Sequence, residues 1–413
     1  MNIAGADLAE QANSTFRLSG WLVCLLASLA AIGTLSTNII LPSFPAMGIA
    51  LDVPTPQMGL LLSVFFIVLA AGQLVVGPLS DCYGRSRLVV SGLAVFIAGS
   101  LLCAMAETFE VLLAGRIIQA AGVCAAVVLS RAIARDLFDG EVLARVLSIT
   151  MVAMAAAPGF SPLLGGALDA GFGWRVTFVF VAVLGALLAG CYLLVIGETH
   201  QPERRSVYTG AMVIRAYAAL LADTRFILPA MAGSLIMGGL YAFFSATPGI
   251  LMGSLGLLPL QVGIFFAATV VVVFAAGISA PRLAHKWGIA RVISAGIVIA
   301  LAGGAGLLLQ STPDLPGFIL SMAIFLFGMG LVNPLTIAMA MHPFGSQAGQ
   351  ASALVGFLQM ACAAIATVFT SLFPLRAVDA LAVVIIGGSL LSLLIFLPYL
   401  FSCSKAGQAE AGT

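Results

Sequence analysis

One arginine and one glutamine lie a helical turn apart inside a long apolar run, and this pair has the clearest chemical potential in the sequence. The run reads LLAGRIIQAAG over residues 112–122, with Arg116 about two turns inside and Gln119 on the same helical face. A guanidinium keeps its proton and costs about 2.5 to 3.5 kcal/mol at the centre of a membrane helix. Arg116 must therefore face partners or water. We expect it to mark a water-accessible pocket; the alternative is a structural arginine that binds backbone carbonyls.

A short charged segment separates the second and third apolar runs. It reads GPLSDCYGRSR over residues 77–87, and the runs beside it are each long enough to cross ~30 Å of hydrocarbon. Pro78 is expected to close the preceding helix, and Gly84 to take a positive φ. Asp81 can accept hydrogen bonds from helix amides or from a guanidinium such as that of Arg85. The segment therefore predicts a hinge latch between two membrane helices.

The composition requires a membrane around most of the chain. Of the 413 residues, 62% are hydrophobic and only 8% are charged, and the mean hydropathy is +1.16. Soluble domains carry about 25% charged residues. The apolar runs stay unbroken for about twenty residues, whereas a membrane barrel alternates over segments of about ten. The fold class is therefore an all-α integral membrane protein.

Apolar runs bounded by charges, glycines or prolines predict twelve transmembrane helices in two pseudo-symmetric six-helix bundles. The predicted division is an N-terminal segment 1–19, a first bundle 20–196, a linker 197–225, a second bundle 226–401 and a tail 402–413. The predicted spans are 20–42, 57–78, 88–106, 109–131, 143–168, 174–196, 226–250, 260–281, 290–310, 316–341, 348–372 and 378–401. The sequence APRLAHKWG at 280–288 repeats the 77–87 segment in the second half, with Gly288 in the place of Gly84.

Lys and Arg are distributed unevenly between the two predicted sides of the membrane. If the N-terminus is inside, all but three of the 17 fall in cytoplasmic segments. The exceptions are Arg175 and Arg376, on the opposite side, and Arg116, within a span. Because positively charged loops stay in the cytoplasm, both termini are predicted to be cytoplasmic.

Several of these motifs resemble those of the major facilitator superfamily. The G-x-x-x-D-x-x-G-R-x-R spacing at 77–87 is similar to its signature between helices two and three. The L-x-x-x-R-x-x-Q-x-x-G run at 112–122 resembles the fourth-helix motif of drug and proton antiporters, where the resemblance implies proton transfer by the Arg. The PLLGG ending of 158–166 resembles the antiporter motif of the drug-export branch. The stretches LSTNIILPSFPAM at 35–47 and HPF at 342–344 are similar to the bicyclomycin-resistance (Bcr/CflA) group.

Asn38 departs from this resemblance, because most relatives carry Asp there. That carboxylate is the natural proton site, and Asn38 cannot titrate. Every acidic residue of the chain is predicted in a loop or at a span end. Two hypotheses follow: either protonation has moved to Glu110 or Asp81, or the substrate is an anion that pairs with Arg116 and needs no fixed carboxylate.

The predicted site has two groups of residues. The residues expected to line a central cavity are polar, aromatic or sulfur-containing side chains of cleft-facing spans: Asn38, Gln73, Arg116, Gln119, Met151, Met154, Tyr241, Ser245, Asn333 and Gln359. The residues expected to couple or gate are Asp81, Gly84, Arg85, Arg87, Glu110, Arg116, Pro162, Gly165 and Gly166. The Asn333-Pro334 pair is expected to unwind the tenth span beside the cavity.

These features predict a multi-pass transporter of a bacterial inner membrane that exports drug-like compounds or a secreted metabolite by alternating access, with proton antiport as the coupling. Uniport or import of a carboxylated metabolite is the alternative that Asn38 favours. A polytopic membrane enzyme or sensor is the alternative of another class; no nucleophile, base or metal set lies within the spans. The interpretation implies a small organic substrate, protons as a coupling ion, a lipid bilayer around a monomer, and neither nucleic acid nor a metal or other cofactor.

Overall fold

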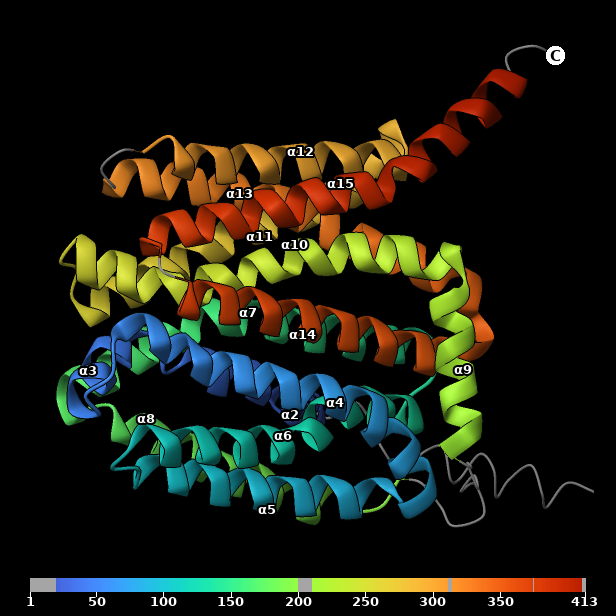
Figure 1. Cartoon of the computed structure of the whole chain (residues 1–413). Helices are drawn as coiled ribbons and strands as arrows, with labels where there is room; N and C mark the ends of the chain where they lie inside the picture. Colours follow the sequence, from blue (N-terminus) through green and yellow to red (C-terminus); the bar gives the residue numbers. More distant parts are fainter. Residues whose placement is uncertain (1–19, 200–209, 311–313, 374, 411–413) are drawn as a thin grey trace, which may run out of the picture.

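The fold is built from helices that run back and forth across one slab (Figure 1). A computed structural model describes residues 20–199, 210–310, 314–373 and 375–410, and in these ranges the regular elements are all helical. Twelve of the helices are long and apolar enough to span a membrane. The predicted fold class and the positions of the twelve spans are confirmed.

Each half of the chain contributes six long helices. In the first half they are α2 (Gly20–Asn38), α4 (Leu60–Tyr83), α5 (Arg85–Ala104), α6 (Phe109–Leu137), α7 (Gly140–Phe172) and α8 (Arg175–Val195). In the second half they are α10 (Thr224–Pro248), α11 (Pro259–Trp287), α12 (Ile289–Leu308), α13 (Leu315–Met341), α14 (Ala348–Leu372) and α15 (Ala377–Glu410). The shorter elements are η1 (Leu41–Ser43), α3 (Phe44–Ala50), η2 (Thr55–Gly59), α9 (Gly210–Ala222), η4 (Gly249–Ser254) and η5 (His342–Gln347).

The halves pack internally and then meet along two seams. In the first half α5 packs on α6 and α8, and α2 packs on α6 and α7; in the second, α12 packs on α13 and α15, and α10 packs on α14 and α15. Between the halves, α4 packs on α14 and α7 packs on α11. Small residues permit these close approaches: a Cβ on Gly122 of α6 would lie 2.2 Å from the backbone nitrogen of Phe96 in α5.

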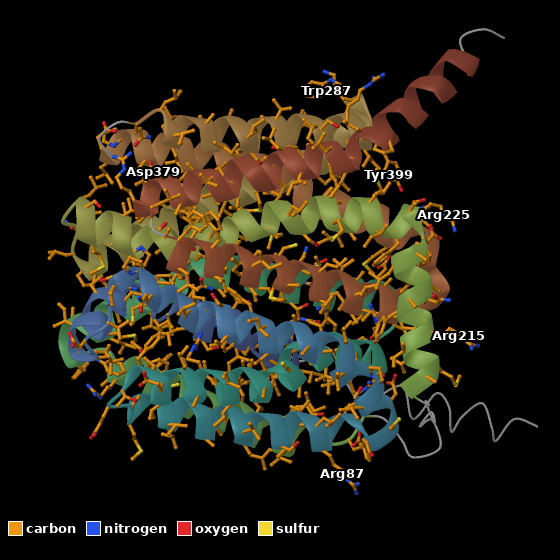
Figure 2. All side chains as sticks on the ribbon, in the orientation of Figure 1. Arg87, Arg215, Arg225, Trp287, Asp379 and Tyr399 are labelled. Atoms are coloured by element: carbon orange, nitrogen blue, oxygen red, sulfur yellow. The ribbon has the colours of Figure 1, made fainter. Side chains whose placement is uncertain are left out.

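The two ends of the slab differ in charge. Arg215 and Arg225 lie at one end, by α9, Arg87 lies in the first turn of α5 toward the same end, and Asp379 lies at the other end (Figure 2). We call the end that holds α9 and the junction of α4 with α5 the arginine-rich face, and the opposite end, which holds α3, the α3 face. Helix α9 crosses the arginine-rich face within the region predicted as a linker (Figure 1).

Two local predictions about proline were wrong. Pro78 lies inside α4, which continues to Tyr83, and the break falls at Gly84, whose φ is +94°. Pro334 lies inside α13, which runs unbroken from Leu315 to Met341, so Asn333 does not border an unwound segment. Neighbouring helices in a bundle can compensate for the hydrogen bond that proline removes. The predicted positive φ of Gly84 is confirmed, and Gly288, its counterpart in the second half, has a φ of +87°.

Candidate functional site

The Arg116 side chain is completely buried inside the first half of the protein. Its Nε donates to the carbonyl oxygen of Leu61 on α4 at 3.3 Å, and its Nη1 donates to that of Ser36 on α2 at 3.2 Å. Nη1 also donates to Oε1 of Gln119, one turn along α6. The guanidinium carbon lies 4.4 Å from the centre of the Phe65 ring, which adds a cation–π contact. Arg116 thus ties α2, α4 and α6 together.

Gln119 extends this network to a fourth helix. Its Nε2 donates to Oγ of Ser100 on α5 at 2.8 Å, and Ser100 donates in turn to the carbonyl oxygen of Phe96 at 2.7 Å. Gln119 and Ser100 are fully buried. The predicted pairing of Arg116 and Gln119 on one helical face is confirmed, and their partners lie within the first half.

The expectation that Arg116 faces water is wrong for this conformation. Two of the five guanidinium N–H groups donate to backbone carbonyls, which is the structural alternative that the sequence left open. Two buried polar atoms of this region have no hydrogen-bond partner among the described residues: Nη2 of Arg116 and Oδ1 of Asn38. The Asn38 Nδ2 donates to the carbonyl oxygen of Thr34 at 2.8 Å, which fixes the orientation of its amide. The two N–H groups of Nη2 and the Oδ1 of Asn38 therefore remain available to a substrate, a water molecule or a rearranged helix.

Three of the other predicted lining residues lie at contacts between α4 and the second half. Gln73 is buried, and a Cβ on Gly356 of α14 would meet its side chain at 2.9 Å. The ring of Tyr241 on α10 lies 4.5 Å from that of Phe66 on α4. Ser245, also on α10, is buried beside Gly59 at the start of α4.

The remaining lining candidates divide into a bonded pair and two methionines. Nε2 of Gln359 donates to Oδ1 of Asn333 at 3.0 Å, which links α14 with α13 inside the second half. Met151 and Met154 lie on the part of α7 nearer the arginine-rich face, and Met151 is 64% exposed. The structure therefore does not bring all ten lining candidates to one cavity.

Direct contacts join the halves toward the α3 face. The hydroxyls of Ser63 on α4 and Thr367 on α14 lie 2.8 Å apart. A Cβ on Gly59 would lie 2.2 Å from the hydroxyl oxygens of both Ser245 and Ser371. The α4–α14 seam is therefore closed at this face.

The α7–α11 seam is closed at the same face by Pro162 and Gly166 of the predicted antiporter motif. A Cβ on Gly166 would lie 2.7 Å from the carbonyl oxygen of Pro259, and the carbonyl oxygen of Pro162 lies 2.9 Å from the corresponding position on Gly263. Gly165 packs within its own half, against the backbone of Ile39. Small residues at these positions permit tight helix contacts.

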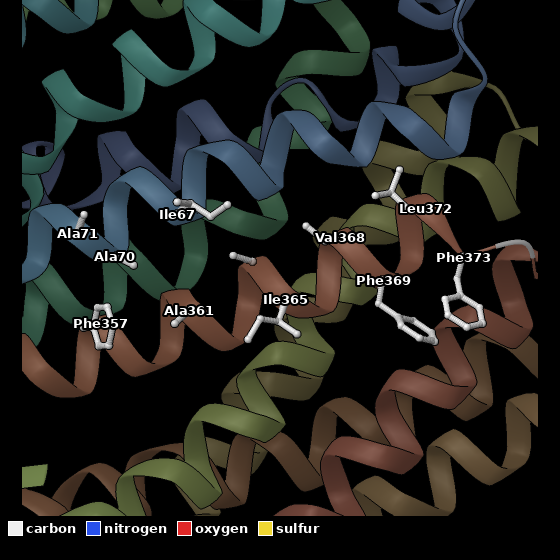
Figure 3. Close-up of a pocket in the computed structure, with 11 residues that line it drawn as sticks. Ile67, Ala70, Ala71, Phe357, Ala361, Ile365, Val368, Phe369, Leu372 and Phe373 are labelled. Atoms are coloured by element: carbon white, nitrogen blue, oxygen red, sulfur yellow. The ribbon is translucent and has the colours of Figure 1, made fainter.

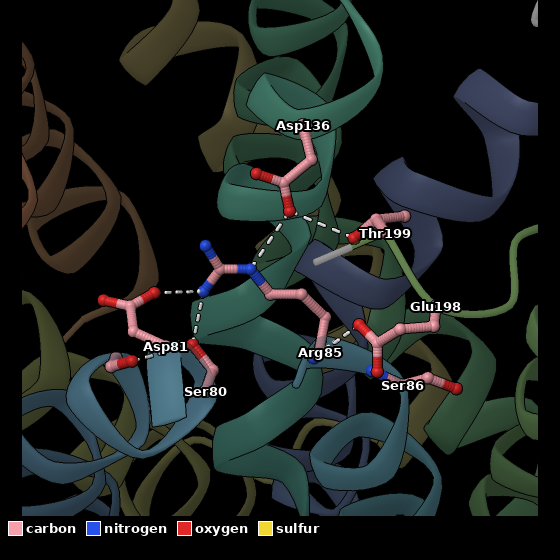
Figure 4. Close-up of polar contacts among 8 residues, drawn as sticks. Ser80, Asp81, Arg85, Ser86, Asp136, Glu198 and Thr199 are labelled. Atoms are coloured by element: carbon pink, nitrogen blue, oxygen red, sulfur yellow. Dashed lines mark hydrogen bonds and ion pairs between the residues drawn. The ribbon is translucent and has the colours of Figure 1, made fainter. Parts of the chain in front are cut away.

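The predicted latch is present at the arginine-rich face and is larger than expected (Figure 4). Nη1 of Arg85 binds Oδ1 of Asp81 at 2.8 Å and also the hydroxyl of Ser80, and Nε binds Oδ2 of Asp136 on α6 at 3.0 Å. Glu198, which follows α8, accepts hydrogen bonds from the backbone nitrogens of Arg85 (2.9 Å) and Ser86 (3.3 Å). The carboxylate caps the first turn of α5, where the helix dipole favours negative charge.

Sequence reasoning missed Asp136 and Glu198 as parts of this latch. The available signal was that each lies at the end of a predicted span, on the same side as Asp81. Arg87, a predicted gating residue, is exposed, and Glu110 is exposed in the first turn of α6, nearly two turns from Arg116. No ion pair joins Glu110 to Arg116 in the described part of the chain.

Two cavities lie on the α4–α14 side of the molecule. The first, of about 700 Å³, is an apolar groove between α4 and α14 (Figure 3). The second, of about 580 Å³, lies at the arginine-rich face, and Gln73, Asp81 and Arg85 are among its lining residues. Arg116 lines neither.

Two helical halves that meet along α4–α14 and α7–α11 and close at one face define a polytopic transport protein rather than an enzyme. Residues 26–367 match the Major Facilitator Superfamily, and the chain belongs to that family.

Curated relatives extend over most of the chain. The Bacillus subtilis (strain 168) protein named uncharacterized MFS-type transporter YdgK is 32% identical and covers 82% of this chain and 85% of its own length. Multidrug resistance protein D of Escherichia coli (strain K12) is 28% identical and covers 94% and 98%. The bicyclomycin resistance protein homolog of Haemophilus influenzae is 28% identical and covers 86% and 89%.

A solved structure confirms the fold. A bacterial homolog of the human lysosomal transporter Spinster superposes with a TM-score of 0.67 at 15% identity, over 92% of this chain and 94% of the other. The family match assigns the superfamily, and the structural match supports the fold.

Proposed function

We propose that this protein exports small organic compounds across a bacterial inner membrane by alternating access. The moving units are residues 20–196 and 226–401, the linker is 197–225, and both termini and the arginine-rich face are cytoplasmic, as the positive-inside rule requires. The protein works as a monomer. Relatives named for resistance to several drugs and to bicyclomycin, matched over most of their length, support drug-like compounds as the substrate class.

The observation that carries the proposal is the uneven closure of the α7–α11 seam. The close contacts at the glycines of α7 and α11 join residues 159–166 of α7 to residues 259–270 of α11, toward the α3 face. Nearer the arginine-rich face, the same two helices carry exposed side chains: Met151 of α7 by 64%, and Val271 and Ile278 of α11 by 69% and 56%. This pattern supports a conformation that receives substrate from the cytoplasm. Release requires the α3-face contacts to open.

Arg116 is the residue that we assign to substrate binding and coupling. In the conformation described here, the guanidinium of Arg116 donates to the carbonyl oxygens of Ser36 and Leu61, and no carboxylate lies within ion-pair distance of it among the described residues. When the first half rearranges, the guanidinium exchanges these carbonyls for an anionic group. With Asp81 or Glu110 as the proton carrier the cycle is proton antiport. With a carboxylated substrate the same exchange needs no proton, and Asn38 is the observation that favours this second candidate.

Efflux from everted membrane vesicles tests the proposal. Arg116→Ala is expected to abolish uptake of a fluorescent drug into the vesicles while membrane insertion stays normal, because the anion-exchanging group is lost. Arg291→Ala, which removes an exposed arginine outside this network, is the matched control. Full activity of Arg116→Ala would remove Arg116 from the site. Collapse of the pH gradient is expected to stop transport if protons are the coupling ion. Unchanged flux would exclude proton antiport and favour transport of a carboxylated substrate.

A further inference from the structure

The two cavities follow one another along the same pair of helices. The apolar groove is lined by α4 residues up to Ala71 and by α14 residues from Phe357 onward, and the cavity at the arginine-rich face begins with Gln73 on α4 and ends with Ala353 on α14. Ile67 and Val368 lie between α4 and α14, whereas Ile365, Phe369 and Phe373 project on the side of α14 away from α4 (Figure 3). The groove is lined by Ile67, Ala70, Ala71, Phe357, Ala361, Ala364, Ile365, Val368, Phe369, Leu372 and Phe373. A long apolar groove therefore leads toward a polar cavity.

The groove opens outward, to the hydrocarbon of the membrane. Ile67 is 54% exposed and Ile365 is 72% exposed, and both lie in the middle part of spanning helices. From Ser352 to Ile365 the helix rises about 20 Å, more than the ~15 Å depth of one leaflet. An alkyl chain that entered from the bilayer would fit along this distance.

The polar cavity holds two arginines whose charges nothing in the described chain neutralises. Arg131 and Arg135 lie one turn apart on α6, where like charges repel. Nη1 of Arg131 is 3.3 Å from the Ser352 hydroxyl of α14, and neither guanidinium has a carboxylate within ion-pair distance among the described residues. The two carboxylates that line the cavity, Asp81 and Asp136, both bind Arg85.

We propose that this groove and cavity bind an anionic phospholipid of the surrounding membrane, with its phosphate on Arg131 and Arg135 and one acyl chain between α4 and α14. Guanidinium groups pair well with phosphate oxygens. The open apolar side of the groove selects a bilayer lipid over a solute from water. Because Arg131 belongs to the first half and Ser352 to the second, the bound lipid bridges the halves. The site is independent of which solute the protein carries.

Native mass spectrometry of the purified full chain tests this site. After mild delipidation, phosphatidylglycerol is expected to remain bound more strongly than phosphatidylcholine. Arg131→Gln/Arg135→Gln is expected to reduce phosphatidylglycerol binding about tenfold or more, because charge-assisted hydrogen bonds to phosphate are lost. The matched control is Arg282→Gln/Arg291→Gln, which removes two exposed charges from the second half. Equal retention of both lipids, or no loss in the first double variant, would overturn the proposal.

A second variant separates the lipid from a free anion. Ala361→Trp fills the groove without changing charge, and it is expected to weaken phosphatidylglycerol binding while leaving any inorganic phosphate binding unchanged. Displacement of phosphatidylglycerol by inorganic phosphate, together with full lipid binding by Ala361→Trp, would assign the site to a soluble anion and refute the lipid. Thermal unfolding of each variant in detergent verifies that it is folded.

Discussion

Gly59 provides a direct way to shift the balance between the two conformations that transport requires. It lies at the start of α4, at the α3 face, where a Cβ would be 2.2 Å from the hydroxyl oxygens of both Ser245 and Ser371. Gly59→Ala therefore inserts a methyl group between the halves in the conformation whose α3 face is closed. In the conformation whose α3 face is open, the methyl group meets no such neighbour. Overpacking of this kind costs about 1 to 3 kcal/mol. Since about 1.4 kcal/mol is a factor of ten, the ratio of open to closed α3 face should rise by about 5-fold to 150-fold.

Spin-label distances measure this shift. Ile49 and Leu309 are each 85% exposed at the α3 face, one in each half, and their cysteine variants in a cysteine-free background can carry the labels. Gly59→Ala is expected to add or enlarge a long-distance population. Gly249→Ala is the matched control, because a Cβ there meets nothing within 4 Å.

Relief of the clash should reverse the effect. The variant Gly59→Ala/Ser245→Ala/Ser371→Ala removes both hydroxyls and is expected to restore the distance distribution of the unmodified protein. Gly59→Ala with an unchanged distribution would refute the argument that this contact holds the α3 face closed. A shift that persists in the triple variant would refute its steric basis.

Two further predictions concern charges at the arginine-rich face. Asp136→Asn should destabilise the protein by about 1 to 2 kcal/mol. The double variant Asp81→Asn/Asp136→Asn should destabilise it by more than the sum of the two single changes, because the guanidinium of Arg85 then loses both of its carboxylate partners. Additive effects on the melting temperature would contradict the shared latch. Asp223 caps α10, and its hydrogen bonds with the side chain and backbone of Arg225 lower the pKa of the carboxyl. Folding therefore favours ionised Asp223, so its stabilisation is present above the ordinary carboxyl pKa and is lost as the pH falls through the lowered value. The melting temperature of Asp223→Ala should lie below that of the unmodified protein at pH 7 and converge with it in acid, and a constant difference would contradict this assignment.

The sequence alone determined the membrane class, the twelve spans, the charge difference between the two ends and the Asp81–Arg85 latch. These features follow from local rules: a span needs about twenty apolar residues, and a charge cannot stay in hydrocarbon unpaired. The same rules identified Arg116 as a buried cation in need of partners. They did not identify the partners, because every residue has a backbone carbonyl oxygen and the residue type does not indicate which carbonyl accepts the hydrogen bond.

Only the tertiary structure decided what holds that cation and where the halves meet. The carbonyls that bind Arg116 belong to Ser36 and Leu61, on other helices, and become neighbours only when α2, α4 and α6 pack. The extra members of the latch, Asp136 and Glu198, and the contact of Arg131 with Ser352 likewise depend on segments that are distant in the sequence. Helix formation is set by nearby residues, whereas the distribution of buried charges is set by packing over the whole chain.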